Sequence, residues 1–269
     1  MQKTDKTNRK KRSICIIIYF LVMIVCPWTV KADSGDRIAD AKNGIVEVVS
    51  GFSDKEGVFH KMKSASGFLI GNTEGRIYIV TNNSVVQNSS EEKEEYCREY
   101  NISADDYGMA DSIRIIVKGD VAVEAAVMAG SGELDFCILS TENMVNEKMA
   151  LKLGDPALLS VGSAVYALGF PNAKNLEYVT ADVEIYQGNV QDKEAEQSER
   201  NYIQHSAVIS ESNTGGPLLD EDGYVVGINC KEYSDISSGR YYSLPVSELT
   251  EVLDNFAIAY DSRIRTCSW

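Results

Sequence analysis

The sequence predicts an all-β protein that ends in one short α-helix. Short apolar runs rich in β-branched residues recur along the chain after residue 33, and Gly, Asn, Asp and Ser separate them. No helical periodicity falls between these runs, which favours a sandwich or a barrel. Only near the end do apolar residues recur at helical spacing. With 44% apolar residues among 269, the chain is long enough to bury a sizeable core.

The expected strands follow one another from residue 45 to residue 228. The clearest are Ile45–Val49, Gly67–Ile70, Ile77–Thr81, Ile113–Val117, Val121–Met128, Phe136–Leu139, Ala164–Leu168, Val179–Ile185, Tyr202–Gln204 and Tyr224–Ile228. The expected helix covers Val246–Phe256, directly after Pro245, with acidic residues on its other face. Two acidic stretches, Gln87–Asp111 and Gln191–Arg200, lie between strand signals, so we expect both to be surface loops.

Residues 1–32 are expected to lie outside the fold. A basic stretch precedes the apolar run Ile14–Val30, and compact residues stand at the −3 and −1 places before Asp33. This arrangement is typical of a secretory signal peptide. The alternative is an uncleaved anchor that tethers the chain to a membrane through residues 13–30, although Pro27 interrupts this run and it is short for a spanning helix. Either alternative predicts a secreted or extracytoplasmic protein, with residues 33–269 as its folded part.

The charge of the folded part argues against nucleic acid as a partner. Residues 1–32 hold seven of the 26 basic residues and one of the 40 acidic ones, which leaves 19 and 39 and a net charge of −20. Phosphate binding needs cations, and such a surface offers few. With two histidines in the chain and no Cys-x-x-Cys spacing, we expect neither a metal site nor a cofactor.

Four cysteines remain after residue 32: Cys97, Cys137, Cys230 and Cys267. An exported chain can pair them in three complete ways, and the sequence does not choose among these. Cys137 and Cys230 lie inside apolar runs, so buried free thiols are an equally good interpretation.

Three separated segments carry the functional argument. The first is Ser66–Ile70 followed by Ile77–Val86, the second is Glu133–Leu139, and the third is Ser210–Leu219 followed by Gly223–Asn229. In this order and spacing they resemble the trypsin-like peptidases, most closely the bacterial HtrA (Deg) branch. Leu151–Asp155, Val161–Gly169 and Tyr242–Val246 resemble further motifs of that branch. The resemblance spans about 200 residues, and it implies two six-stranded antiparallel β-barrels, with a boundary near residues 150–160 and the active site in the cleft between them. The C-terminal PDZ domain that these relatives often carry has no counterpart in this sequence.

Matching the motifs residue by residue places the catalytic triad at Ser84, Asp135 and Thr214. Asp135 keeps the carboxylate that orients the base. Ser84 stands where the family has the histidine base, and a hydroxyl is far too weak a base near pH 7. Thr214 stands where the family has the serine nucleophile, and its β-branch adds a methyl group in a crowded turn. The resemblance implies that Ser212 and Thr214 form the oxyanion hole. Ser212 stands where the family has a glycine, at a position that favours positive φ.

Neither histidine is expected to replace the lost base. His60 precedes the first motif and is interpreted as a surface imidazole, and the resemblance places His205 near the walls of the substrate pocket. Because a buried carboxylate needs hydrogen-bond donors, we expect Ser84 to donate to Asp135 in a small polar cluster with Thr214.

The sequence therefore predicts a trypsin-like serine protease homologue that is catalytically inactive and binds a peptide or protein in the inter-barrel cleft. One alternative is an active endopeptidase that uses Thr214 with a non-standard base. Another is a structural surface scaffold, whose cleft would be filled by side chains instead of presenting an open strand edge.

Overall fold

The computed structural model describes residues 34–73, 75–103, 111–118, 121–142, 148–170, 182–197 and 200–263. The expected signal peptide or anchor (residues 1–32) and Cys267 lie outside the described residues. Within these ranges no helix is both long and apolar enough to cross a membrane.

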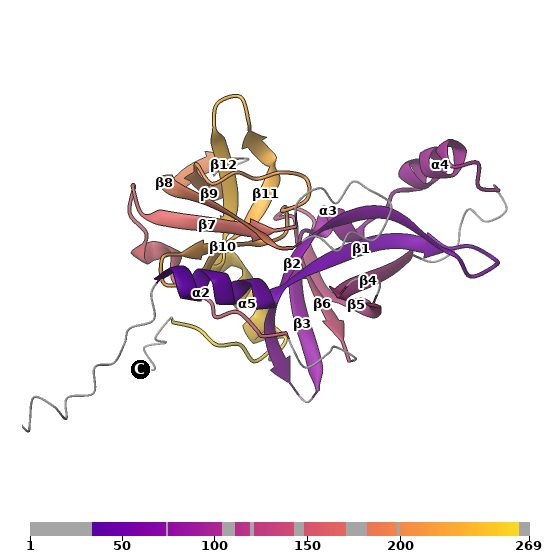
Figure 1. Ribbon diagram of the computed structural model, residues 1–269, viewed down its shortest axis with the longest axis horizontal. Helices are drawn as coiled ribbons and strands as arrows, with labels where there is room; N and C mark the ends of the chain where they lie inside the picture. The colour runs from indigo at the N-terminus through magenta and orange to yellow at the C-terminus, as the bar shows by residue number, and fades with distance from the viewer. Residues whose placement is uncertain are drawn as a thin grey trace, which may run out of the picture. The chain divides into compact units, whose positions relative to one another are not determined.

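The first barrel is built from the strands β1 to β6 (Figure 1). They are β1 (Ile45–Ser53), β2 (Phe59–Thr73), β3 (Arg76–Thr81), β4 (Asp111–Lys118), β5 (Val121–Ser131) and β6 (Phe136–Thr141). The strands close in the order β1-β2-β3-β6-β5-β4, and every neighbouring pair is antiparallel. Val46, Val48, Ile79, Ile115 and Leu139 belong to one buried apolar cluster that draws on these strands.

The second barrel follows the same principle with the strands β7 to β12. They are β7 (Ala164–Gly169), β8 (Glu184–Gln197), β9 (Arg200–His205), β10 (Pro217–Asp220), β11 (Val225–Asp235) and β12 (Arg240–Pro245). They close in the order β10-β11-β12-β9-β8-β7, again with antiparallel pairs. Its own apolar cluster includes Val165, Ile203, Leu218 and Val226.

A third apolar cluster joins the barrels. It contains Phe68 and Phe136 from the first barrel, Leu168 and Ile228 from the second, and Leu249 from the C-terminal helix α5 (Ser247–Asn255). The helix α2 (Ser34–Ala41) contributes to the same cluster, and two short 3-10 helices, η1 (Lys42–Gly44) and η2 (Pro156–Leu158), precede β1 and β7. The predicted fold is thus confirmed: two closed six-stranded antiparallel barrels and a short C-terminal helix.

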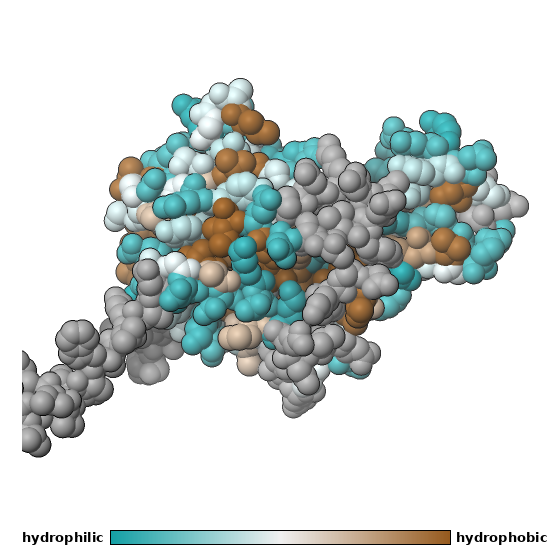
Figure 2. Space-filling view, viewed as in Figure 1, coloured by the Kyte–Doolittle hydropathy of each residue, from teal (hydrophilic) through white to brown (hydrophobic). Residues whose placement is uncertain are grey.

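The expectation that Gln87–Asp111 is a loop was wrong in part, because the segment contains the helix α4 (Ser90–Glu99). Its start is a capping box: the Ser89 side chain accepts from the Glu92 backbone N–H, and the Glu92 carboxylate accepts from the Ser89 backbone N–H. The Ser-x-x-Glu spacing that signals this motif is present in the sequence. Exposed glutamates cover the outer side of α4, so its surface is largely hydrophilic (Figure 2).

The second acidic stretch, Gln191–Arg200, is also not a simple loop. It forms the end of β8 and the start of β9, which pair with Ala195 opposite Tyr202. Ala195 is buried between the exposed Glu194 and Glu196, so the acidic side chains occupy only one face of the hairpin. Of the expected strand Val179–Ile185, Glu184 and Ile185 belong to β8, Asp182 and Val183 precede it, and residues 179–181 lie outside the described residues.

Candidate functional site at the junction of the two barrels

Ser84 and Asp135 lie side by side because of the register between β3 and β6. These strands are antiparallel with Thr81 opposite Cys137, so the residues that follow β3 meet those that precede β6. After β3 the chain forms the short helix α3 (Asn83–Val86), which contains Ser84. Asp135 is the last residue before β6 and has a left-handed backbone, with φ of 48°.

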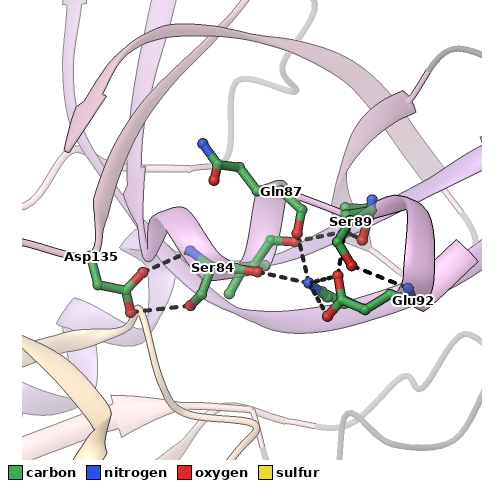
Figure 3. A network of polar contacts seen from close by, with 9 residues as sticks. Ser84, Gln87, Ser89, Glu92 and Asp135 are labelled. Atoms are coloured by element: carbon green, nitrogen blue, oxygen red, sulfur yellow. Dashed lines mark hydrogen bonds and ion pairs between the residues drawn. The ribbon is translucent and has the colours of Figure 1, made fainter. Parts of the chain in front are cut away.

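The Asp135 carboxylate accepts two hydrogen bonds from Ser84 (Figure 3). The backbone N–H of Ser84 donates to Oδ1 at 2.7 Å, and its hydroxyl donates to Oδ2 at 3.1 Å. Desolvation by burial raises the pKa of Asp135, whereas the bonds from Ser84 act in the opposite direction. Ser84 itself is exposed, and Asp135 is half-buried.

Lys63 holds the other end of α3 in place. Its ammonium group donates to the carbonyl oxygens of Ser84 at 3.2 Å and Gln87 at 2.6 Å. It also pairs with the Glu92 carboxylate of α4 at 2.8 Å. Figure 3 shows this network running from Asp135 through Ser84 and Gln87 to Ser89 and Glu92. A cation at the last carbonyls of a helix is favourable, so Lys63 anchors the segment that presents Ser84.

Thr214 lies in the turn between β9 and β10, and its hydroxyl contacts neither Ser84 nor Asp135 by any hydrogen bond among the described side chains. The hydroxyl donates to the carboxamide oxygen of Asn82 at 2.7 Å. The Asn82 carboxamide nitrogen donates in turn to the Asp135 backbone carbonyl at 2.6 Å. Asn82 is fully buried. It therefore connects Asp135 and Thr214, two of the expected triad positions, which share no hydrogen bond of their own.

Asn82 is a site residue that the sequence motifs did not predict. It precedes Ser84 by two residues in the matched motif, and that proximity was the available signal. An asparagine at a strand end is common in turns, however, so the residue type alone does not indicate a contact with Thr214.

The backbone around Thr214 satisfies its own hydrogen-bonding groups. The Thr214 N–H, one of the two expected oxyanion-hole donors, donates to the Ser210 carbonyl at 3.2 Å. The Ser210 N–H donates to the Asn213 side chain at 2.7 Å, and the hydroxyls of Ser210 and Ser212 lie 3.0 Å apart. Ser212 is not among the described residues with positive φ; the turn places that conformation at Gly215, where φ is 76°. These polar groups of the turn thus form hydrogen bonds with one another.

Ser66 ties this turn to the first barrel. Its hydroxyl donates to the Ser212 carbonyl at 2.7 Å and accepts from the Phe170 N–H at 2.9 Å. Its own backbone N–H donates to the Thr214 carbonyl at 3.0 Å. Since Ser66 has no exposed surface, these bonds are shielded from water and position the turn firmly.

The two histidines lie apart from the triad positions. His205 has no exposed surface, and its Nε2 contacts the Ser243 hydroxyl at 3.0 Å. Burial lowers the pKa of His205 to about 3, so the ring is neutral at physiological pH. His60 is on β2, where its Nε2 lies 2.7 Å from the Asp54 carboxylate. Neither ring makes a hydrogen bond to Thr214 among the described contacts.

Cys137 and Cys230 are buried free thiols, and Cys97 is buried on α4. Burial raises the pKa of both Cys137 and Cys230 to about 12, so these thiols stay protonated and unreactive. Across the described ranges, no three His, Cys, Asp or Glu side chains are grouped so that they would hold a metal ion.

Two closed barrels, with Asp135 bonded to Ser84 and linked to Thr214 through Asn82, define the scaffold of a chymotrypsin-like peptidase. The sequence model of the trypsin-like peptidase domain matches residues 65–228, which is more than half of the chain. The chain therefore belongs to the trypsin-like peptidase domain family.

Curated relatives support a distant relationship to HtrA proteins. The chain is 27% identical over 200 residues to "Serine protease Do-like HtrA" of Bacillus subtilis, covering 71% of this chain and 38% of that protein. It is 24% identical over 212 residues to "Serine protease Do-like HtrA" of Lactobacillus helveticus, covering 75% and 45%. It is 28% identical over 147 residues to "Protease Do-like 1, chloroplastic" of Arabidopsis thaliana, covering 54% and 34%. The chain thus spans less than half the length of each of these relatives.

Proposed function

We propose that this protein is a catalytically inactive member of the family, a pseudoprotease that binds a peptide or protein at the junction of its barrels. One observation carries the proposal: the Thr214 hydroxyl donates to the carboxamide oxygen of Asn82. A neutral amide does not accept a proton near pH 7, whereas a hydroxyl nucleophile needs a general base within hydrogen-bond reach.

Two further features support the loss of catalysis. Ser84 occupies the base position and uses its hydroxyl to donate to Asp135. The Thr214 N–H donates to Ser210 and is not directed toward a reacting oxygen. The names of the relatives as serine proteases support the opposite alternative, in which Thr214 acts as a nucleophile with a non-standard base.

A fluorophosphonate probe distinguishes these alternatives when adducts are read by intact mass on the purified full-length chain. We expect no adduct on the parent protein. The matched variants are Ser84→His alone and Ser84→His combined with Thr214→Ser and Ser212→Gly, which restores all three positions. An adduct on the triple variant alone supports an intact scaffold with a disabled site. An adduct at Thr214 of the parent overturns the proposal.

We further propose that the protein acts outside the cytoplasm, either secreted or tethered through residues 13–30. The basic stretch and the apolar run of the first 32 residues support this. Fractionation of cells that express the full chain, followed by N-terminal sequencing, tests it. A new N-terminus at Asp33 supports export with cleavage, an intact chain in the membrane fraction supports the tether, and an intact chain in the cytosol overturns the proposal.

A further inference from the structure

The tip of the β8–β9 hairpin contacts the first barrel next to the expected triad positions. Arg200 is the first residue of β9 and lies opposite Gln197 at this tip. Its guanidinium group donates to the Glu133 carboxylate at 2.5 Å. Glu133 lies between β5 and β6, two residues before Asp135, whose carboxylate accepts from Ser84. The ion pair therefore crosses from the second barrel to the first beside the proposed binding site.

The same two segments also share an apolar cluster. Leu134 stands between Glu133 and Asp135 in the chain, and it packs against the cluster that joins the barrels. Ala195 and Tyr202, which lie opposite each other in the hairpin, are buried members of that cluster. The hairpin and the turn before β6 thus meet through apolar packing as well as through the ion pair.

The hairpin has a bent base and a weak charged contact at its tip. The pairing of β8 with β9 shifts register between Val190 and Asp192 and again between Asp192 and Ala195. Such bulges bend a strand and interrupt its hydrogen-bond ladder. Among the polar contacts described for the hairpin beyond these shifts, the pair of Arg200 with Glu133 is the one that reaches the first barrel. These side chains are 37% and 75% exposed, and an exposed ion pair contributes little to stability, so it opens readily.

We propose that the ion pair between Arg200 and Glu133 is an autoinhibitory latch, which holds the tip of the hairpin against the first barrel and opens when a peptide binds at the junction. This inference rests on the proposed function, because it names a regulatory contact of the same binding site. A peptide that lies between the barrels beside Asp135 passes the place where the pair forms, so a closed latch and a bound peptide exclude each other. The latch then lowers the apparent affinity by the fraction of molecules that are closed.

Hydrogen exchange measures the latch without any ligand. In the full-length protein, Arg200→Gln and Glu133→Gln are each expected to speed amide exchange in β9 and in the end of β8 by about twofold to fivefold. The matched control is Arg76→Gln. Arg76 pairs with Glu142 within the first barrel at 2.9 Å, and these side chains are 44% and 70% exposed, so the same kind of pair is removed elsewhere. Unchanged exchange in both hairpin variants overturns the latch.

Peptide retention measures its effect on binding. The probe is a synthetic pool of short uncharged peptides, which the immobilised full-length protein retains and mass spectrometry quantifies. Uncharged peptides are used because the variants differ from the parent in net charge. Arg200→Gln and Glu133→Gln are each expected to retain about twofold to fivefold more than the parent, and Arg76→Gln the same amount as the parent.

Exchanging the two charges separates the latch from other effects of the substitutions. Glu133→Arg combined with Arg200→Glu forms a pair of reversed polarity and keeps the net charge of the parent. We expect this double variant to return to the retention and exchange rates of the parent, whereas each of its single changes places like charges opposite each other and opens the hairpin tip. Raising NaCl from about 0.05 M to about 0.5 M is expected to reduce the difference between the parent and Arg200→Gln.

Each other outcome has a distinct meaning. Equal retention by the parent and Arg200→Gln overturns this inference and leaves the proposed function standing. Retention by the charge-exchanged variant that stays as high as in its single variants also overturns it, because a re-formed pair then fails to close the site. Retention of no peptide by the parent or any variant overturns the proposed peptide-binding function and this inference with it, even where hydrogen exchange shows that the hairpin tip opens.

Discussion

The Thr214 hydroxyl lies 2.7 Å from the carboxamide oxygen of Asn82, and this bond joins the second barrel to the first at the expected nucleophile position. Asn82 is buried and also donates to the Asp135 carbonyl at 2.6 Å. The oxygen and the nitrogen of the Asn82 carboxamide therefore each have a partner, and the Thr214 hydroxyl has an acceptor that is not a histidine.

The bond between Asn82 and Thr214 is expected to contribute to stability. Asn82→Ala leaves the Thr214 hydroxyl and the Asp135 carbonyl without these partners, which costs about 1–3 kcal/mol of the free energy of unfolding. Thr214→Val removes the hydroxyl and keeps the shape of the side chain. Urea denaturation of both single variants and the double variant gives the coupling energy. A coupling near zero would show that the two side chains do not interact in solution.

Ser84→Ala is expected to raise the pKa of Asp135 further. The Ser84 side chain stabilises the ionised carboxylate by donating to Oδ2, and alanine removes that bond but keeps the backbone N–H that donates to Oδ1. Carbon-13 NMR of the aspartate carboxyl groups measures the change directly. Ser90→Ala, on α4, is the control and should leave the Asp135 titration where it is. A lower pKa in Ser84→Ala would contradict the assigned hydrogen bond.

His205 is expected to destabilise the fold in acid. Its folded-state pKa is lowered to about 3 by burial, below the ordinary value of 6.5, so the unfolded chain binds the proton more readily. This contribution to stability is complete above pH 6.5. It is lost as the pH falls from there toward 3, with a limiting slope of about 1.4 kcal/mol per pH unit. His205→Gln should lack this component when unfolding is measured across the same pH range, and equal slopes in parent and variant would refute it.

The ion pair between Lys61 and Glu47 is expected to be sensitive to removal of one partner. The side chains are 7% and 4% exposed, with Nζ 2.9 Å from Oε1, and Ser64 also donates to the Glu47 carboxylate. Lys61→Met leaves a buried charge uncompensated, which costs about 3–5 kcal/mol of the free energy of unfolding. Lys61→Met combined with Glu47→Leu should recover much of this loss. Thermal unfolding measures both, and a double variant less stable than Lys61→Met would contradict the explanation.

The sequence was sufficient for the elements whose signal is local. Alternating apolar residues located the centres of most strands, and Pro245 with the spacing of Val246 and Leu249 located α5. Local signals were missed where composition was misleading. The acidic residues of α4 and of the β8–β9 hairpin indicated loops, but a capping box and backbone pairing decide those segments.

What the sequence by itself determined is the family, and with it which residues are expected at the triad positions, because the motifs around Ser84, Asp135 and Thr214 follow in order. The tertiary structure alone decided what those residues contact. Asn82 and Thr214 are 132 positions apart in the chain, so no local pattern relates them. The closure of two barrels and the apolar cluster between them bring these side chains together. Burial of apolar surface drives this packing over the whole chain, and hydrogen bonds then form only between groups that the packing places within reach.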